Sequence, residues 1–189
     1  MKRQAGFTLI ELVVVISILG ILAATALPRY AALQSQARIA KLNGAIGAVK
    51  GAASLAHGAC LATTTPVACT SAAFSLPMEG ALVTLINQYP TADAAGIISA
   101  AGLTLSATEG YATLDAGSAA AGGLITIEVL GNLPATCSFT YTNPAVAGTA
   151  PAYGVPVTTG CCLILHSPAR LRLLIGSRPA LCHTKSGKS

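Results

Sequence analysis

Residues 1–28 read MKRQAGFTLIELVVVISILGILAATALP, and this stretch decides the fold. It contains an apolar run from Phe7 to Leu27 in which Glu11 is the only charged residue. As a helix this run would cover about 32 Å, which matches the hydrocarbon core of a bilayer at about 30 Å. The sequence therefore predicts a membrane-spanning helix at the amino terminus.

The order of segments at this terminus differs from that of an ordinary secretory signal. A removable signal has a basic start, an apolar stretch of about 7–15 residues and then a small residue at the cleavage site. Here the small residue Gly6 precedes the apolar run and ends a basic leader, residues 1–6. Lys2 and Arg3 predict a cytoplasmic leader, with the remainder of the chain outside the cytoplasm. Cleavage after Gly6 would leave the apolar helix on the mature protein.

Glu11 places a carboxylate within the apolar run, where a charged group is energetically unfavourable. Such a group costs on the order of 2.5–3.5 kcal/mol at a bilayer centre and less near the interface. Cleavage after Gly6 would create a positive amine at Phe7, one helical turn from Glu11. The two charges could neutralise each other within one chain or between neighbouring chains. Glu11 thus favours a functional segment with a partner for the carboxylate over the alternative, a plain membrane anchor.

The sequence GFTLIE at residues 6–11, after a short basic leader and before the apolar run, resembles the class III signal of type IV pilins and pseudopilins. The resemblance implies that a prepilin peptidase cuts after Gly6 and methylates the new amine of Phe7. It also implies that Glu11 guides docking of subunits in the filament. Gly20 and Pro28 match the family's pattern, in which the intervening helix loosens when the subunit leaves the bilayer for the fibre. Independently, proline removes one helical hydrogen bond and clashes with the preceding turn, so we expect a kink or local melting at Pro28.

Residues 29–57 are predicted to continue the helix as an amphipathic segment that follows the transmembrane and assembly segment, residues 7–28. One apolar face recurs at spacings of three and four: Ile39, Leu42, Ile46, Val49, Ala53 and Ala56. A second line holds small residues: Ala37, Ala40, Gly44, Gly47 and Gly51. This line either lets another backbone approach closely or is a weak, glycine-rich part of the helix. His57 is expected to end the helix, where a cation is favourable.

Residues 58–161 are predicted to form a globular, β-rich head with disulfide loops. Candidate strands are residues 82–86, 124–129, 138–141 and 153–158, with a short helix near residues 92–101 that Thr91 or Asp93 could cap. Thr126 and Glu128 alternate outward, and Pro156 makes the last strand an edge. The predicted fold class is α+β: a long amino-terminal α-helix packed on a small antiparallel β-sheet, in the order helix, loop, meander.

Export beyond the inner membrane makes disulfides expected among the six cysteines. Cys60 and Cys69 flank a proline-containing loop, and Cys137 and Cys161 flank the last hairpin-like region, so we pair them in this way. Each closure would stabilise the head by about 2.5–3.5 kcal/mol. Other connectivities stay open, because spacing does not fix pairing.

The two predicted disulfides also carry finer resemblances. The pair Cys137–Cys161 resembles the carboxyl-terminal disulfide of type IV pilins, whose enclosed D-region is exposed, variable and often adhesive. The pair Cys60–Cys69 is similar to features of the mannose-sensitive haemagglutinin subgroup, as are the segment 42–58 and the sequences at residues 89–90 and 96–98.

Positive charge is concentrated at the carboxyl end of the chain. The formal net charge of +5 comes from residues 162–189, a basic tail without a carboxylate, whereas residues 1–160 sum to zero. Only 9% of residues are charged, which argues against disorder and against nucleic-acid binding by overall charge. Pilins usually end soon after the second D-region cysteine, so the tail departs from the family.

Three interpretations of the tail stay open. It is an extension without a specific role, including a shifted reading frame, or an accessory element that pairs Cys162 with Cys182, or a basic amphipathic surface for a membrane or DNA. A zinc site from Cys161, Cys162, His166, Cys182 and His183 has suitable ligand types but lacks the usual paired spacing. We therefore predict no metal and no cofactor.

The resemblance implies a structural subunit of a type IV pilus, a homo-oligomeric helical filament for adhesion, motility or related functions. Implied partners are the prepilin peptidase, the inner-membrane assembly platform with its cytoplasmic motor, and the outer-membrane secretin. The prepilin would lie in the bacterial inner membrane and the fibre on the cell surface. No catalytic triad or phosphate-binding glycine loop is found, so no enzyme is predicted.

Two alternatives remain within the same family. One is a pseudopilin of a type II secretion system, although resemblance to its major members would imply calcium-ligating carboxylates near the end, and the sequence has none after Glu128. The other is a minor pilin that binds DNA through the basic tail.

Overall fold

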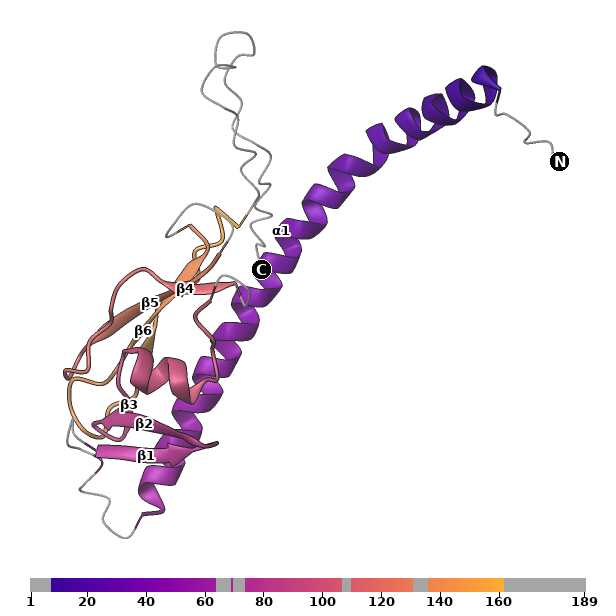
Figure 1. The fold of residues 1–189 in the computed structure, drawn as a ribbon. Helices are drawn as coiled ribbons and strands as arrows, with labels where there is room; N and C mark the ends of the chain where they lie inside the picture. Colours follow the sequence, from indigo (N-terminus) through magenta and orange to yellow (C-terminus); the bar gives the residue numbers. More distant parts are fainter. Residues whose placement is uncertain (1–7, 64–68, 70–73, 107–109, 131–135, 162–189) are drawn as a thin grey trace, which may run out of the picture.

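The computed structural model describes residues 8–63, 69, 74–106, 110–130 and 136–161 of the chain (Figure 1). One long helix carries two small antiparallel sheets on its carboxyl-terminal half. The elements are α1 (Leu9–Leu61), β1 (Phe74–Met78), β2 (Ala81–Ile86), β3 (Tyr89–Pro90), the π-helical turn η2 (Ala94–Ile98), β4 (Tyr111–Thr113), β5 (Leu124–Val129), β6 (Ser138–Thr142) and β7 (Ala152–Tyr153). The predicted α+β class is confirmed.

The helix α1 continues further than the sequence indicated. It runs for 53 residues and ends at Leu61, so neither Gly58 nor His57 terminates it. Cys60, in its last turn, is fully buried, which explains why packing outweighs the low helix propensity of glycine here. The expected role of His57 at the helix end was wrong: its ring stacks on Tyr89, with the centroids 4.4 Å apart.

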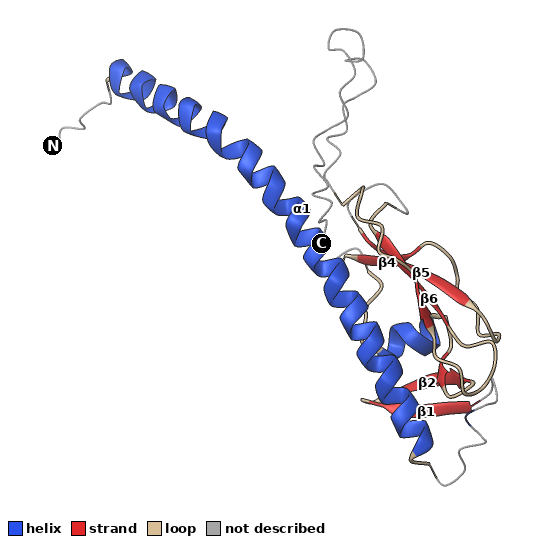
Figure 2. Cartoon of the chain, turned by 180° about the vertical axis from the view of Figure 1, so that it is seen from behind, coloured by secondary structure: helices blue, strands red, loops and turns tan. Residues whose placement is uncertain are grey.

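The backbone remains α-helical through Pro28, so the local melting expected there was wrong. Figures 1 and 2 show instead that the axis of α1 curves gently along its length. A proline removes one main-chain hydrogen bond, and a long helix accommodates that loss by bending.

Two sheets replace the single sheet that the sequence indicated. The first has the order β1-β2-β3 and the second the order β4-β5-β6-β7, and all pairs are antiparallel. Between the two sheets lies η2, in the region predicted to be a short helix. Of the two predicted caps, Asp93 is the one used: its side chain accepts a hydrogen bond of 2.7 Å from the main-chain N–H of Gly96.

The strands follow the sequence pattern to different degrees. The predicted strand 124–129 is β5, and β2 and β6 each extend one residue beyond their predictions. The last strand is shorter than expected, since β7 has two residues and a single bridge joins Val157 to Ser138. Three strands were not predicted: β1, which contains Pro77, β3 and β4.

The side chain of Glu128 lies where the alternation puts it, but it is not exposed. Ile127 and Val129 point into the core, whereas Glu128 stands on the other face of β5 between Ala112 and Ser138 of the neighbouring strands. It is only 8% exposed. The expectation of an outward, solvated side chain was therefore wrong, because that face of the sheet is covered at this position.

The core lies between the carboxyl-terminal half of α1 and the two sheets. The predicted apolar face of the helix is confirmed as the buried one, with Leu42, Val49, Ala53 and Ala56 almost without exposure. Tyr141 of β6 is also fully buried, and its hydroxyl donates a hydrogen bond of 2.8 Å to the carbonyl of Pro90 in β3. This bond ties one sheet to the other.

Two disulfides join distant parts of the head. Cys60 in α1 is bonded to Cys69, with Cα atoms 6.1 Å apart, and Cys137 is bonded to Cys161, with Cα atoms 4.8 Å apart. These are the two pairs named from the sequence. Cys162 and Cys182 lie outside the described residues.

Candidate assembly site and processing motif

The amino-terminal half of α1 presents its apolar side chains to the outside of the molecule. It projects away from the head without touching either sheet (Figure 2). The exposed side chains on this half include Leu9, Ile10, Leu12, Val13, Ile16, Leu19, Ile21, Leu22 and Leu27. Among the described residues, α1 is the one helix long and apolar enough to cross a membrane.

Two hydroxyl groups in this apolar segment are satisfied within the helix itself. The Ser17 hydroxyl donates to the carbonyl of Val13 at 2.8 Å, and the Thr25 hydroxyl donates to the carbonyl of Leu22 at 3.0 Å. An unsatisfied polar group costs several kcal/mol in lipid. These side chains are therefore compatible with insertion into hydrocarbon.

Glu11 is held at the start of the helix by a reciprocal capping arrangement with Thr8. Its Oε2 atom accepts hydrogen bonds from the Thr8 main-chain N–H at 3.0 Å and from the Thr8 hydroxyl at 2.8 Å. The main-chain N–H of Glu11 in turn donates to the Thr8 hydroxyl oxygen at 3.4 Å. This capping box begins α1 and points the carboxylate back toward the amino terminus.

Thr8 is the site residue that the sequence analysis missed. The signal was present, because Thr8 and Glu11 have the spacing of a capping box directly before an apolar run. Thr8 was overlooked because the charge of Glu11 indicates a cationic partner, whereas Thr8 is uncharged.

The remaining predicted site residues are spread along the helix and do not form one cluster. Gly20 lies within the exposed apolar half, and a Cβ atom added there would have nothing within 4 Å. Pro28 follows about two turns later in the same continuous helix. Gly6 and Phe7 lie outside the described residues. Within the described amino-terminal part of the chain, the site residues that contact each other are Thr8 and Glu11.

The line of small residues on α1 faces away from the head. Ala37, Ala40, Gly44, Gly47 and Gly51 are all exposed. An added Cβ atom at each of the three glycines would meet nothing within 4 Å. No backbone in the described part of the chain uses this line, so close approach by another helix stays a prediction.

In the described residues, no group of three or more His, Cys, Asp and Glu side chains is placed to hold a metal ion. Most of the zinc ligands considered from the sequence, Cys162, His166, Cys182 and His183, lie outside the described residues. Cys161, the remaining one, is engaged in the disulfide with Cys137.

The amino-terminal helix and its motif can be compared with those of known proteins. A long helix with an exposed apolar half, begun by a Thr–Glu capping box, carries a disulfide-bonded head. Residues 1–27 match the family described as the prokaryotic N-terminal methylation motif.

Relatives with curated names extend this match beyond the motif. The chain is 50% identical over 60 residues to fimbrial protein EcpB of Eikenella corrodens, covering 31% of this chain and 38% of that protein. It is 50% identical over 50 residues to the type IV major alpha-pilin of Moraxella bovis, covering 26% and 31%. It is 48% identical over 54 residues to the type IV narrow pilus major component PilA5 of Thermus thermophilus, covering 29% and 47%.

The amino-terminal third of the chain is thus similar to that of type IV pilins. The aligned segment spans less than half the length of each of these relatives. No solved structure matches the chain.

Proposed function

We propose that this chain is a structural subunit of a type IV pilus. The observation that carries the proposal is the apolar half of α1, which is fully formed, extends beyond the head and has no partner in the described part of the chain. A segment of this kind needs either lipid or other copies of itself to cover its surface. A protein that is first stored in a membrane and then polymerised meets both conditions in turn.

Processing would precede assembly. A prepilin peptidase would remove residues 1–6 by cutting after Gly6 and would methylate the amine of Phe7. The motif match over residues 1–27 supports this step. The position of Thr8 supports it further, because the helix cap begins immediately after the proposed new terminus. Cleavage would therefore remove the leader without disturbing α1.

Glu11 would set the register between subunits. In the single chain its Oε2 atom already reaches back to the main-chain N–H of Thr8, at 3.0 Å. The amine of Phe7 would be the next nitrogen along the chain, and a neighbouring subunit would bring a second one. A carboxylate in an apolar surrounding is stabilised by such a cation. The Glu11 carboxylate of each subunit would therefore pair with the Phe7 amine of its neighbour, and this pairing would fix the register of the two helices.

Three parts of the chain would then have separate roles. Residues 7–28 would anchor the prepilin and later form the filament interior, and Gly20 and Pro28 would let this segment loosen on extraction. Residues 29–57 would carry the head, and residues 58–161 would form the outer surface. An inner-membrane platform with its cytoplasmic motor would drive extraction, and an outer-membrane secretin would pass the fibre to the cell surface.

The registering role is tested by exchanging one carboxylate for an amide. We expect Glu11→Gln to leave membrane insertion and processing intact and to lower the yield of sheared fibres by about tenfold. Glu79→Gln is the matched control, since Glu79 is exposed in the head and loses the same charge. Equal fibre yields from the two variants would rule out the registering role.

The intact mass of protein sheared from cells tests the wider proposal. The expected mass lacks residues 1–6, carries one methyl group on Phe7 and shows two or more disulfides. The same measurement reports the true carboxyl end. An unprocessed mass in membranes, with no sheared material, would contradict the proposal.

A further inference from the structure

The hairpin turn between β2 and β3 has a strained backbone. Asn87 and Gln88 form it, and their φ angles are +51° and +73°. Two consecutive left-handed residues are typical of a tight hairpin turn, where the second position is usually glycine. Gln88 is not glycine, so this conformation costs free energy and persists only where the surroundings impose it.

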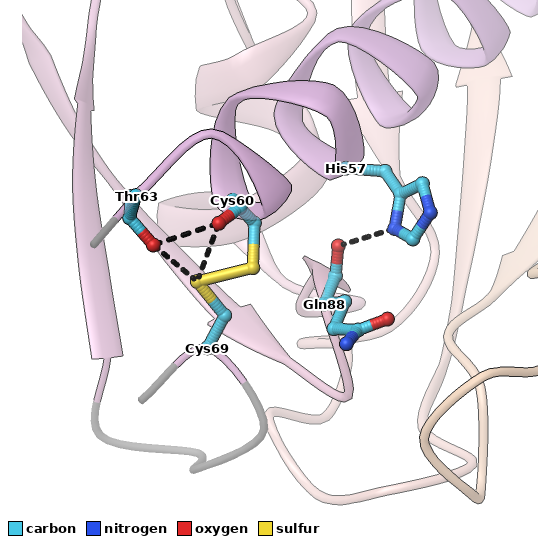
Figure 3. The surroundings of a disulfide bond; sticks show 5 residues. All are labelled: His57, Cys60, Thr63, Cys69 and Gln88. Atoms are coloured by element: carbon cyan, nitrogen blue, oxygen red, sulfur yellow. Dashed lines mark hydrogen bonds between the residues drawn. A yellow bond between two sulfur atoms is a disulfide. The ribbon is translucent and has the colours of Figure 1, made fainter. Parts of the chain in front are cut away.

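Three separate segments hold this turn. The main-chain N–H of Gln88 donates to the carbonyl of Cys69 at 2.9 Å. The carbonyl of Gln88 lies 3.3 Å from Nδ1 of His57, and Figure 3 draws this contact as a dashed line. The Asn87 side-chain amide donates to the carbonyl of Pro144 at 2.9 Å. The turn is thus held by hydrogen bonds to the helix, to Cys69 and to the segment after β6.

The hydrogen bond from the Gln88 N–H depends on the position of Cys69, which the disulfide to Cys60 fixes. Cys69 and Cys60 are both fully buried, and Cys60 belongs to the last turn of α1 (Figure 3). His57 lies one turn earlier on the same helix, and its ring stacks on Tyr89 with the planes 3° apart. Both groups that hold the backbone of Gln88 therefore stand on, or are bonded to, the end of α1.

We propose that the Cys60–Cys69 disulfide is a conformational lock that imposes the strained turn at Asn87 and Gln88 and so fastens the sheet β1-β2-β3 to the end of α1. Breaking the lock releases the turn and loosens that sheet. The sheet β4-β5-β6-β7, which has its own disulfide, keeps its structure. The bridge thus acts on a hairpin that contains neither cysteine.

Amide hydrogen exchange on the full-length chain in detergent micelles tests this lock. In the double variant Cys60→Ala/Cys69→Ala, we expect the Gln88 amide and the β2–β3 amides to exchange at least tenfold faster, with β5 and β6 within twofold of the wild type. Unchanged exchange at Gln88, or equal acceleration of both sheets, would overturn the proposal. The variant Cys137→Ala/Cys161→Ala is the control that removes a disulfide elsewhere.

A second substitution separates the lock from general loss of stability. Glycine adopts left-handed angles without cost, so Gln88→Gly in the bridge-free chain should restore exchange in β2 and β3 to within threefold of the wild type. Gln88→Ala keeps the cost and should restore nothing. Rescue by both substitutions, or by neither, would contradict the lock.

The variant His57→Phe covers the case in which the bridge-free chain does not fold. Phenylalanine keeps a ring against Tyr89 but has no N–H to donate to Gln88. We expect a three- to tenfold faster exchange of the Gln88 amide with both disulfides formed. A wild-type exchange rate at this amide would show that the hydrogen bond from His57 to the Gln88 carbonyl does not hold the turn, and would overturn the proposal.

Discussion

The two halves of α1 differ in apolar content and lie in opposite surroundings. Leu33 is 60% exposed, whereas Leu42, nine residues further along the same helix, has no exposed surface. The first half is apolar on all sides, and the second has one apolar face with polar or small residues opposite. A helix that is apolar all round needs lipid or a bundle, while a single apolar face needs one packed neighbour. Apolar content and its distribution around the helix together distinguish the exposed amino-terminal half from the packed carboxyl-terminal half.

The largest expected effect acts on the first half alone. Substitution Gly6→Leu should abolish trimming, because the proposed peptidase site would no longer end in a small residue. All of the protein should then keep its leader in mass spectra, with no sheared fibre. Both disulfides should still form, since the head packs on the other half of the helix. Trimmed protein from this variant would break the comparison.

A matched pair of leucine substitutions measures the difference between the halves directly. Leu42→Ala should lower the free energy of unfolding of the head by about 2–5 kcal/mol, because it removes a fully buried side chain and leaves a cavity. Leu33→Ala should change the same quantity by less than about 0.5 kcal/mol. Urea unfolding in micelles, followed by head-specific signals, gives both values. Similar losses for the two variants would contradict the separation of the halves.

A smaller effect is expected where the two sheets meet. Tyr141→Phe removes the hydroxyl that donates to Pro90, and we expect a loss of about 1 kcal/mol at neutral pH. Burial raises the pKa of Tyr141, so the unfolded chain ionises first as the pH increases. Stability should therefore decline above about pH 10, the ordinary pKa of a phenol. Unfolding curves from pH 8 to 11 should show a weaker decline in the variant, and an identical decline would contradict the assignment.

The smallest effect concerns an exposed lysine on the carboxyl-terminal half of α1. The ammonium of Lys50 lies 5.2 Å from the ring centroid of Tyr153 in β7. Such contacts contribute about 0.5–1 kcal/mol at exposed sites. Lys50→Met should lower the free energy of unfolding by that amount, and should have no effect when Tyr153→Leu is already present. If Lys50→Met lowers the free energy of unfolding equally when Tyr153→Leu is present, the Tyr153 ring is not the partner of the Lys50 ammonium.

The features that could be predicted from the sequence are those with a local cause. The spacing of Leu42, Val49 and Ala53 identified the buried face of α1, because helical geometry alone fixes which side chains share a face. The alternation in residues 124–129 likewise gave β5 at its observed bounds. The capping box of Thr8 and Glu11 is equally local, although its spacing was not recognised.

The features that escaped prediction depend on contacts between distant segments. Pro77 and the short run before it do not read as a strand, yet β1 forms because β2 pairs with it along five residues. The extra turn of α1 beyond His57 contains Cys60, which is fully buried and bonded to Cys69, a residue outside the helix. Glu128 was assigned to the correct face, but alternation does not tell whether that face is covered.

The way in which the two sheets end has a consequence for the proposed fibre, in which the heads would be packed at high local concentration. Three of the four outer strands, β3, β4 and β7, have two or three residues, and the fourth, β1, contains Pro77. Long free edges recruit strands from other molecules, while short edges and prolines prevent this. In the proposed fibre, neighbouring heads would therefore lie against one another without merging into cross-β aggregates, and contact between subunits would fall to the helices.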